Sequence, residues 1–345
     1  MWLVQLPEAD SYHMVYATKL IAMLTGKLNE NVFALMTPTR VPFISVGYHQ
    51  ETPRVVDLEL AKRDGIEVIR RDTGGGTVII TGNQQGYRIG IKDKAPGKIE
   101  KIYSIYLSPV IDTLREYGNP QLRGQDLLLN GKKISGNGSV TYDNITCITG
   151  SIIIKNDITV LSKYLKISSE KFRDKIAKSM EEWVTGLSEE IGREVKPVEI
   201  REKLTKVLVE KYNAKVYDLK EEDLSYWDEV SEPEPDSQNY LSHVDRCFKV
   251  TSKVFLCNEE KKFRKLVSVT VRIVDGRIDD AIISGDYFVN PRNAINVLEE
   301  ALKGKTMDEV RWVINEFLRG EIFGFTKEEL ISVFDDINKK YLQQQ

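Results

Sequence analysis

The sequence predicts an α+β protein built from two domains. Its 345 residues amount to about two domains at roughly 150 residues each. Strand-like and helical stretches are interspersed at first, whereas strands come first and helices last after about residue 244, which is typical of a compact α+β module. An acidic stretch at 228–238 contains Pro233 and Pro235 and looks like a linker. We therefore expect a larger domain over residues 1–230 and a smaller one over residues 240–345.

The composition is globular and its charge is balanced. Hydrophobic residues make up 41% and charged residues 29% of the chain. The 49 basic and 52 acidic residues give a net charge of −3, which excludes a generally basic coat for nucleic acid. No apolar run reaches the roughly 18 residues of a membrane span, and the N-terminus has no signal-peptide form. We therefore expect a cytoplasmic protein with no nucleic-acid and no membrane partner.

Cysteine and histidine spacing gives no sign of a structural metal site. The chain has three cysteines and three histidines, and neither a CxxC nor an HExxH pattern occurs. Mg²⁺ that accompanies phosphates stays compatible with the sequence, because it needs only one or two protein carboxylates. The metal ligands therefore remain unknown.

Local signals predict the elements of the first domain in order. Apolar residues at helical spacing predict a helix from Ser11 to about Leu24, capped by Asp10 or Ser11 and stopped by Gly26. Patterning then predicts strands within 31–46, a helix at 55–63, strands at 66–70, 77–80 and 87–91, a helix at 103–116, strands at 126–129, 133–140 and 145–155, and helices within 163–192 and at 200–212. Hairpin turns are expected at 81–83 and 130–131.

The second domain shows a simpler order. Strands are predicted at 248–256, 266–273 and 281–284, with a turn at Asp275-Gly276. Helices are predicted at 291–303, 307–318 and 326–342.

Three consecutive glycines follow the strand that ends at Arg70. Gly74, Gly75 and Gly76 are costly in backbone entropy, so they suit a place where a ligand approaches the backbone closely. Exposed N–H groups in such a loop can hold an anion, and Arg70 and Arg71 can add charge and forked hydrogen bonds. Taken alone, a loose turn beside two surface arginines explains the segment better.

The second informative segment is the predicted hairpin that returns Lys133 at a strand start. A lysine in this position can hold a carboxylate and a phosphate as a point charge. Ser135 and Gly136 are small and leave room for a ligand, and Asp126 on the partner strand can orient the lysine or bind Mg²⁺. An ordinary surface hairpin is the alternative interpretation, and it is again the better one for this segment alone.

Together the segments resemble the lipoate–protein ligase A family, part of the biotin/lipoate ligase fold group. The family pattern is an RRxSGGG loop, a Gly-Asn pair, a hairpin ending in Lys before a Ser-Gly pair, a strand ending in Gly-x-x-Gln, a His-Gly-Thr/Ser-Leu strand and a helix after the core. The similar segments here are Arg70–Gly76, Gly82-Asn83, Lys133–Gly136, Pro42–Gln50, Thr149–Ile152 and Lys178–Leu187. The resemblance covers roughly residues 1–195 and implies a mixed sheet flanked by helices, as in class II synthetases.

The C-terminal part looks like the accessory domain of the same ligases. The similar segments are Val271–Ile278, Ser284–Phe288 and Leu298–Gly304. The resemblance implies that this domain supports activation of the free acid, so that one chain performs both half-reactions.

The resemblance also implies a reaction, its substrates and its partners. ATP, with Mg²⁺, would activate lipoate to lipoyl-AMP, and a lysine of an acceptor lipoyl domain would then take the lipoyl group. The acceptors would be carrier proteins such as the E2 subunits of 2-oxoacid dehydrogenases or the H-type protein of glycine cleavage. No covalent enzyme nucleophile is required.

The site residues follow from the matched motifs. Lys133 would be the catalytic residue, on the substrate carboxyl oxygens and the α-phosphate. The glycines and Thr77 would line the adenylate through backbone N–H groups, Arg70 or Arg71 would meet phosphate or brace the loop, and Asn83 would position the acyl or ribose side. The implied substrate- and ATP-binding residues are Arg70, Arg71, Gly74, Gly75, Gly76, Thr77, Val78, Asn83, Asp126, Ser135, Gly136 and Gly150.

The chain departs from the family pattern in three places. The His-Asp that often precedes Gly82-Asn83 is absent, and Thr149 replaces the histidine before Gly150. Asp72 follows the arginine pair and puts a negative charge beside the expected phosphate site. These changes leave acyl specificity open.

Three other functions stay open or are weighed against the ligase. An octanoyl transferase of the same fold would use Cys147 as nucleophile with Lys133, although a free cysteine is more often a small buried residue. A non-catalytic module that binds lipoyl-adenylate is a further alternative. A biotin ligase is disfavoured, because no GRGR-type run occurs.

His49, near the expected pocket, is either a ligand contact or, more commonly, a packing residue.

Overall fold

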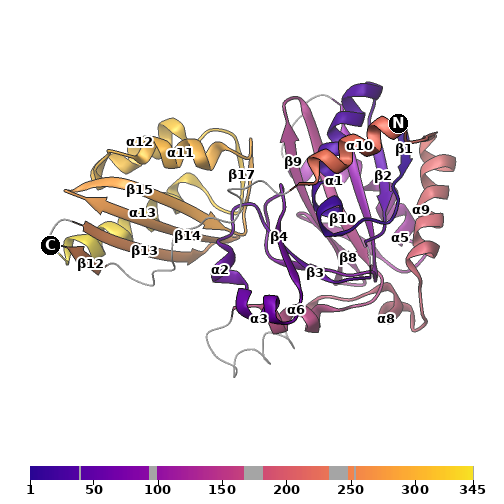
Figure 1. Cartoon of the computed structure of the whole chain (residues 1–345), viewed down its shortest axis with the longest axis horizontal. Coiled ribbons are helices and arrows are strands. Elements are labelled where there is room, and N and C mark those ends of the chain that lie inside the picture. The colour runs from indigo at the N-terminus through magenta and orange to yellow at the C-terminus, as the bar shows by residue number, and fades with distance from the viewer. Residues whose placement is uncertain (39, 93–98, 167–181, 233–247, 252–253, 345) are drawn as a thin grey trace. The chain divides into compact units, whose positions relative to one another are not determined.

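The computed structural model describes residues 1–38, 40–92, 99–166, 182–232, 248–251 and 254–344 (Figure 1). Contacts divide the chain into two compact units. The first comprises Met1–Val46, Val55–Thr73 and Thr77–Ser237, and the second comprises Gly47–Arg54, Gly74–Gly76 and Gln238–Gln345. Two short segments from the N-terminal part of the sequence therefore pack with the C-terminal unit. The proline-containing part of the expected linker lies outside the described residues, as does half of the helical stretch expected within 163–192.

An eight-stranded mixed sheet forms the centre of the first unit. Its order is β11-β1-β2-β6-β10-β9-β8-β7, with β1 parallel to both of its neighbours and the other pairs antiparallel. The strands are β1 (Trp2–Gln5), β2 (Val32–Met36), β6 (Gln84–Ile91), β7 (Pro120–Arg123), β8 (Asp126–Leu129), β9 (Lys132–Tyr142), β10 (Ile145–Ile153) and β11 (Lys215–Tyr217). The expected mixed sheet is confirmed.

Helices cover both faces of this sheet (Figure 1). On one side, α1 (Ser11–Leu28) contacts β6 and β10 and packs with α10 (Glu221–Val230). On the other side, α9 (Pro197–Tyr212) contacts β1 and β6 and packs with α5 (Ser108–Leu114), which follows α4 (Ile99–Tyr106). Neighbouring residues Leu3 and Val4 enter different core clusters, one for each face. Because both faces are buried, strands such as β2 are apolar along their whole length.

A second, three-stranded sheet has the order β4-β3-β5. β3 (Phe43–Val46) is parallel to β4 (Glu67–Arg70) and antiparallel to β5 (Val78–Ile80). α3 (Leu58–Arg63) contacts β4, and α6 (Ile158–Tyr164) contacts β5. In the sequence, α2 (Thr52–Val55) precedes α3, and α8 (Leu187–Ile191) precedes α9. This sheet carries Arg70 at the end of β4.

The hairpin expected at 81–83 is wrong. β5 pairs with β3, whereas β6 pairs with β2 and β10, so the turn connects two different sheets. The carbonyl of Asn83 accepts the N–H groups of Ile154 and Lys155 at 2.9 and 3.3 Å. The turn is therefore tied to the end of β10 rather than closing a local ladder.

The expected helix cap and the second hairpin turn are confirmed, whereas the expected helix stop at Gly26 is wrong. The carboxylate of Asp10 accepts the His13 N–H at 2.9 Å and caps α1. The helix ends later than expected, at Leu28, where Asn29 takes the left-handed conformation (φ 54°). Asn130 and Gly131 both have positive φ, 51° and 87°, as the two-residue hairpin between β8 and β9 requires.

The second unit is a helix-covered antiparallel sheet of order β12-β13-β14-β15, with a small β16-β17 pair. α11 packs on β15 and α13 packs on β13, and α12 contacts both helices (Figure 1). The elements are β12 (Phe248–Thr251), β13 (Val254–Lys262), β14 (Leu266–Val274), β15 (Arg277–Gly285), β16 (Phe288–Asn290), α11 (Ala294–Leu302), a 3₁₀ turn (Met307–Glu309), α12 (Val310–Phe317), β17 (Glu321–Phe323) and α13 (Lys327–Leu342). The predicted order of strands before helices is confirmed, except for the short β17 between α12 and α13. The single strand predicted at 248–256 is wrong, because β12 and β13 are two antiparallel strands, and β16 was not predicted.

His13 links the first turn of α1 to α10. Its Nδ1 and Nε2 lie 2.9 Å from carboxylate oxygens of Asp10 and Asp228, respectively. The ring packs edge-on against Trp227 at 5.0 Å, and the Trp227 indole N–H donates to the His13 carbonyl at 3.2 Å. Burial by itself would lower the pKa of His13, but the hydrogen bonds and charges of the two carboxylates outweigh it and raise the pKa.

This link predicts a pH-dependent contribution to stability. A raised pKa in the folded state stabilises the protein fully below the ordinary histidine pKa of about 6.5, and the contribution is lost as pH rises through the folded pKa. We expect His13→Gln to lower the free energy of unfolding by about 1 kcal/mol or less at pH 6 and by less at pH 9. Urea unfolding of both proteins at the two pH values measures this, and an equal difference at both would contradict it.

Candidate functional site

An ion pair between Lys133 and Asp126 marks the start of the β8–β9 hairpin. Lys133 Nζ lies 2.9 Å from Asp126 Oδ1, and both side chains are partly exposed. Asp126 is opposite Gly136 in the strand register. A Cβ at Gly136 would lie 3.2 Å from both Cε and Nζ of Lys133, so the glycine leaves the space that the lysine side chain occupies. The structure therefore brings together three of the residues expected in the site.

A β-bulge sets this arrangement. Leu127 pairs with Ser135 but Leu128 pairs with Lys133, so β9 has one residue more than β8 at this point. Side chains three positions apart in a regular strand point to opposite faces. The extra residue, Ile134, instead puts Lys133 on the same face as Gly136 and Asp126.

The opposite face of β9 carries a buried polar network. The Tyr87 hydroxyl lies 3.0 Å from Ser135 Oγ and donates to the side-chain carbonyl of Asn137. Asn137 in turn donates to the carbonyl of Gln125 at 2.7 Å. A Cβ at Gly150 would lie 2.3 Å from Asn137 Oδ1, so only glycine fits beneath the network. The structure thus separates Ser135 and Gly150 from Lys133.

A segment before α8 borders the Lys133 backbone. Val184 forms a parallel bridge with Lys133, and the Thr185 N–H donates to the Lys133 carbonyl at 2.9 Å. At Gly186 a Cβ would lie 2.8 Å from the Ile154 carbonyl. Residues 184–186 therefore pack as extended chain against the hairpin, whereas Lys178 and Ser179 lie outside the described residues.

The two arginines lie close together at the end of β4. Nη1 of Arg71 donates to the Ser45 carbonyl at 2.9 Å, and its Nε donates to Thr73 Oγ1 at 3.1 Å. Arg70 is buried, and its carbonyl accepts the Tyr16 hydroxyl at 3.3 Å. Desolvation by burial, and then the charge of Arg70, lower the pKa of Arg71 to about 10. Two neighbouring guanidinium groups, one on a buried and one on a partly buried side chain, favour an anion beside them.

Asp72 has partners in two other elements of the first unit. Its buried carboxylate accepts the Tyr142 hydroxyl, and Thr18 Oγ1 lies 3.5 Å away. These partners belong to β9 and α1. The aspartate that follows the arginines in the sequence therefore packs into the core between a sheet and a helix.

The three glycines belong to the second unit. Gly75 has φ 95° and donates its N–H to the Tyr287 carbonyl at 3.2 Å. A Cβ at Gly74 would lie 2.4 Å from that carbonyl and 3.2 Å from Phe288. A Cβ at Gly76 would lie 3.9 Å from Asp286 Cβ, which is an ordinary contact distance. The close approach that glycine permits is thus to backbone of the same chain.

The remaining expected residues lie in the first unit. Val78 is exposed and pairs with Ser45 at the start of β5, directly after Thr77. The Asn83 side chain donates to Asp157 Oδ2 at 2.9 Å, as does the Thr81 hydroxyl at 2.7 Å. Asn83 therefore braces the chain before α6, a structural role that the Gly-Asn motif alone did not indicate.

Cys147 is enclosed in the core and far along the sheet from Lys133. Its side chain is 0% exposed and its sulfur lies 3.4 Å from the Thr18 carbonyl. Burial, and then the charge of Asp72, raise the pKa of the thiol well above its usual range. Cys147 pairs with Val140, which is roughly 20 Å along β9 from Lys133 at about 3.3 Å per residue. The structure does not bring these two residues together.

Sequence reasoning missed several residues that shape the site. These residues are Tyr87, Asn137 and Thr185. Each is buried and makes one of the hydrogen bonds described above. The available signal was the occurrence of polar residues at inward positions of otherwise apolar strands, which marks a buried network. His49, the other undecided residue, stacks on Tyr287 at 4.8 Å within the second unit.

The described residues contain neither a cluster of metal ligands nor a helix suited to a membrane. They contain no group of three or more His, Cys, Asp or Glu side chains that could hold a metal ion. None of the helices described has both the length and the apolar surface needed to cross a membrane.

Sequence comparison identifies related proteins. The family described as "Lipoyl protein ligase A/B catalytic domain" matches residues 11–209. Lipoate-protein ligase LplJ of Bacillus subtilis is 26% identical over 304 residues, which is 85% of this chain and 88% of the relative. Octanoyltransferase LipM of Kyrpidia tusciae is 23% identical over 202 residues, which is 51% of this chain and 73% of the relative.

Solved structures share the fold. P. falciparum LipL1 in complex with lipoate has a TM-score of 0.70 at 18% identity and covers 99% of both chains. A bi-partite lipoate protein ligase from Thermoplasma acidophilum, studied with its E2 lipoyl domain, has a TM-score of 0.59 at 22% identity, covering 70% of this chain and 98% of its own. A lipoate-protein ligase A bound with ATP has a TM-score of 0.56 at 18% identity, covering 67% and 93%. The lipoate ligase-like α+β fold class is thereby confirmed.

The environment of Cys147 predicts an unreactive thiol. Because the sulfur is enclosed and its pKa is raised, the thiolate is scarce in the folded protein. We expect a thiol reagent at pH 8 to label Cys147 at least about 100-fold more slowly than in urea-unfolded protein. Peptide mapping of the labelled protein measures this, with Cys147→Ala to identify the site, and rapid native labelling would contradict it.

Proposed function

Because the chain belongs to the lipoyl protein ligase A/B catalytic domain family, we propose that it activates lipoate with ATP and transfers the lipoyl group to a lysine of an acceptor lipoyl domain. The names of its relatives support each part of this proposal. LplJ is a lipoate-protein ligase, LipL1 was solved with lipoate, and a fold neighbour was solved with ATP. The Thermoplasma ligase was studied with an E2 lipoyl domain, which supports an acceptor of that class; H-type carriers are a further candidate.

The observation that carries the proposal is the Lys133–Asp126 pair beside Gly136. An ammonium group has three N–H donors. Lys133 Nζ forms an ion pair with Asp126 Oδ1 at 2.9 Å, and its donors would bind two oxygens of the reacting groups. We assign Lys133 to the lipoate carboxylate and the α-phosphate, and Asp126 to orienting Lys133.

The first half-reaction joins two anions. A carboxylate oxygen of lipoate attacks the α-phosphorus of ATP, the new O–P bond forms, and the bond to pyrophosphate breaks. Lys133 and the arginine pair would offset the negative charge that otherwise keeps these groups apart, and holding them in place lowers the entropic cost. Magnesium bound to ATP would offset part of the triphosphate charge, while Asp126 stays paired with Lys133.

The second half-reaction forms an amide. The neutral amine of the acceptor lysine attacks the carbonyl carbon of lipoyl-AMP, AMP leaves with the bonding electrons, and the nitrogen loses a proton. Lys133 would stabilise the oxyanion and the leaving phosphate. The reaction uses no nucleophile from this chain, in agreement with an enclosed Cys147.

Lys133→Ala tests the assignment. We expect lipoate-dependent ATP–pyrophosphate exchange to fall by at least about 100-fold, because a preorganised charge at the reacting groups is lost. Lys132→Ala is the matched control, since Lys132 is its exposed neighbour on the same strand, and it should stay within about twofold of the wild-type rate. An unchanged rate in Lys133→Ala with retained fold would overturn the assignment.

Octanoyl transfer is the second candidate, because curated relatives include octanoyltransferases such as LipM. That reaction needs no ATP and would use a reactive cysteine, and the burial of Cys147 speaks against it. We expect Cys147→Ala to keep more than about half of the ATP-dependent activity, because the thiol has no role in adenylation. Octanoyl transfer between carriers without ATP, lost in Cys147→Ala, would favour the transferase instead. Binding of lipoyl-AMP with neither activity would favour a non-catalytic module.

A further inference from the structure

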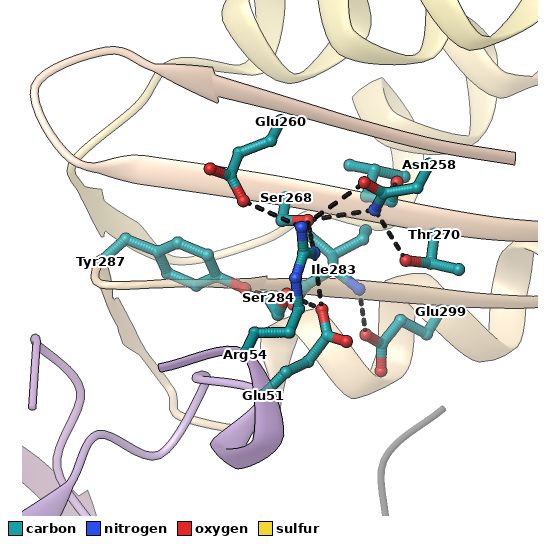
Figure 2. Close-up of polar contacts among 11 residues, drawn as sticks. Glu51, Arg54, Asn258, Glu260, Ser268, Thr270, Ile283, Ser284, Tyr287 and Glu299 are labelled. Atoms are coloured by element: carbon teal, nitrogen blue, oxygen red, sulfur yellow. Dashed lines mark hydrogen bonds and ion pairs between the residues drawn. The ribbon is translucent and has the colours of Figure 1, made fainter. Parts of the chain in front are cut away.

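The second unit contains a buried polar cluster around Glu51 and Arg54, which belong to the segment Gly47–Arg54 (Figure 2). Strand residues that alternate away from the helices face this cluster. They are Asn258 on β13, Ser268 and Thr270 on β14, and Ser284 on β15, and all are buried. A buried polar sheet face needs hydrogen-bonding partners, and Glu51 and Arg54 supply them.

The Glu51 carboxylate is enclosed, with its side chain 1% exposed. Its Oε1 accepts the Ser284 hydroxyl and Nη1 of Arg54, the latter at 3.2 Å. Its Oε2 is buried, and no described residue forms a hydrogen bond with it. Burying a carboxylate with one oxygen unsatisfied costs free energy. A gain in folding stability therefore does not explain why Glu51 is buried here.

Arg54 extends the cluster across two strands. Its Nη1 also donates to the Ser268 hydroxyl, and its Nη2 donates to Glu260 at 3.0 Å and lies 3.5 Å from Asn258 Oδ1. Asn258 is oriented by its own bonds to Thr270 Oγ1 and the Val269 carbonyl, at 2.8 and 3.0 Å. Arg54 is therefore bound by β13 and β14, while Glu51 is bound by β15.

Such a cluster fixes geometry more than it adds stability. Replacing a buried ion pair by apolar side chains of similar size is often neutral or stabilising. A connected set of polar partners, in contrast, admits few arrangements. What the cluster determines is how the segment Gly47–Arg54 lies against β15.

The turn that follows Ser284 connects this segment to Gly74–Gly76, here called the glycine loop. The Gly285 N–H donates to the His49 carbonyl at 2.8 Å, and the Tyr287 ring stacks on the His49 ring. The carbonyl of Tyr287 accepts the N–H of Gly75 at 3.2 Å. The turn at 285–287 therefore binds two groups. One is the His49 carbonyl, two residues before Glu51, and the other is the Gly75 N–H of the glycine loop.

We propose that Glu51 is a positioning residue for lipoate activation, an inference that rests on the proposed function. Its carboxylate touches no substrate. It fixes Gly47–Arg54 through Ser284 and Arg54, and the adjoining turn then holds the glycine loop in the conformation that the anion requires. Disturbing Glu51 loosens the loop and slows the chemical step.

The test compares Glu51→Gln with Glu260→Gln. Both variants replace a carboxylate on the same arginine by an amide, but Glu260 is 44% exposed and lies on the far side of Arg54 from Ser284. We expect Glu51→Gln to reduce kcat of lipoate-dependent ATP–pyrophosphate exchange by about tenfold or more, with KM for ATP and lipoate within about threefold. Glu260→Gln should stay within about twofold in every constant.

Amide hydrogen exchange supplies a readout that does not depend on activity. In Glu51→Gln, exchange at Gly75 and Gly285 should accelerate by about tenfold or more, while the β8–β9 hairpin keeps its wild-type rates. Unchanged exchange at both glycines would overturn the proposal, and so would faster exchange with an undiminished kcat. Acceleration of the hairpin to the same extent would indicate general loosening and would also overturn it.

Two further measurements separate the possible failures. If Glu51→Gln does not fold, Ser284→Ala removes the hydroxyl partner alone and should give the same effects in smaller size. If the wild-type protein shows no lipoate-dependent exchange of pyrophosphate, the proposed function fails. The hydrogen-exchange comparison then still decides whether Glu51 controls the glycine loop.

Discussion

The register of β9 constrains the rest of the candidate site. Side chains alternate between the two faces of a strand, so the face of each residue follows from its position. The bulge at Ile134 adds one residue and thereby reverses this alternation before Ser135. Lys133 can therefore face Asp126 while Ser135 and Asn137 join Tyr87 in the core. The bulge therefore places the charged Lys133 and Asp126 on one face of the sheet and the buried polar Ser135 and Asn137 on the other.

Local chemistry made much of the fold predictable from the sequence. Asn130-Gly131 specifies a two-residue turn because both residues tolerate positive φ, and the turn sets the pairing of β8 with β9. Asp10 is an effective helix cap because its side chain satisfies a free N–H group. Lys133 and the arginine pair became candidates only through the resemblance of several segments to a family pattern, because each segment alone fits a surface hairpin or a loose turn.

Other features depend on contacts that a linear pattern does not contain. β5 and β6 look like a hairpin, yet each finds a better partner in a different sheet. Asp72 follows two arginines, but its carboxylate packs against Tyr142, far away in sequence. Ser135 is separated from Lys133 by a bulge that no residue type announces. The three glycines suggested a ligand, but Gly74 is also required by its close approach to the Tyr287 carbonyl.

The grouping of Gly47–Arg54 and Gly74–Gly76 with the C-terminal strands has a consequence for biosynthesis. These segments emerge from the ribosome long before Ser284 and Tyr287, because chains are made from the N-terminus. During that interval Glu51 has no strand hydroxyl to bind, and Gly75 has no carbonyl partner. The nascent chain can pack its eight-stranded sheet early, but these two segments reach their final conformation only when synthesis is nearly complete.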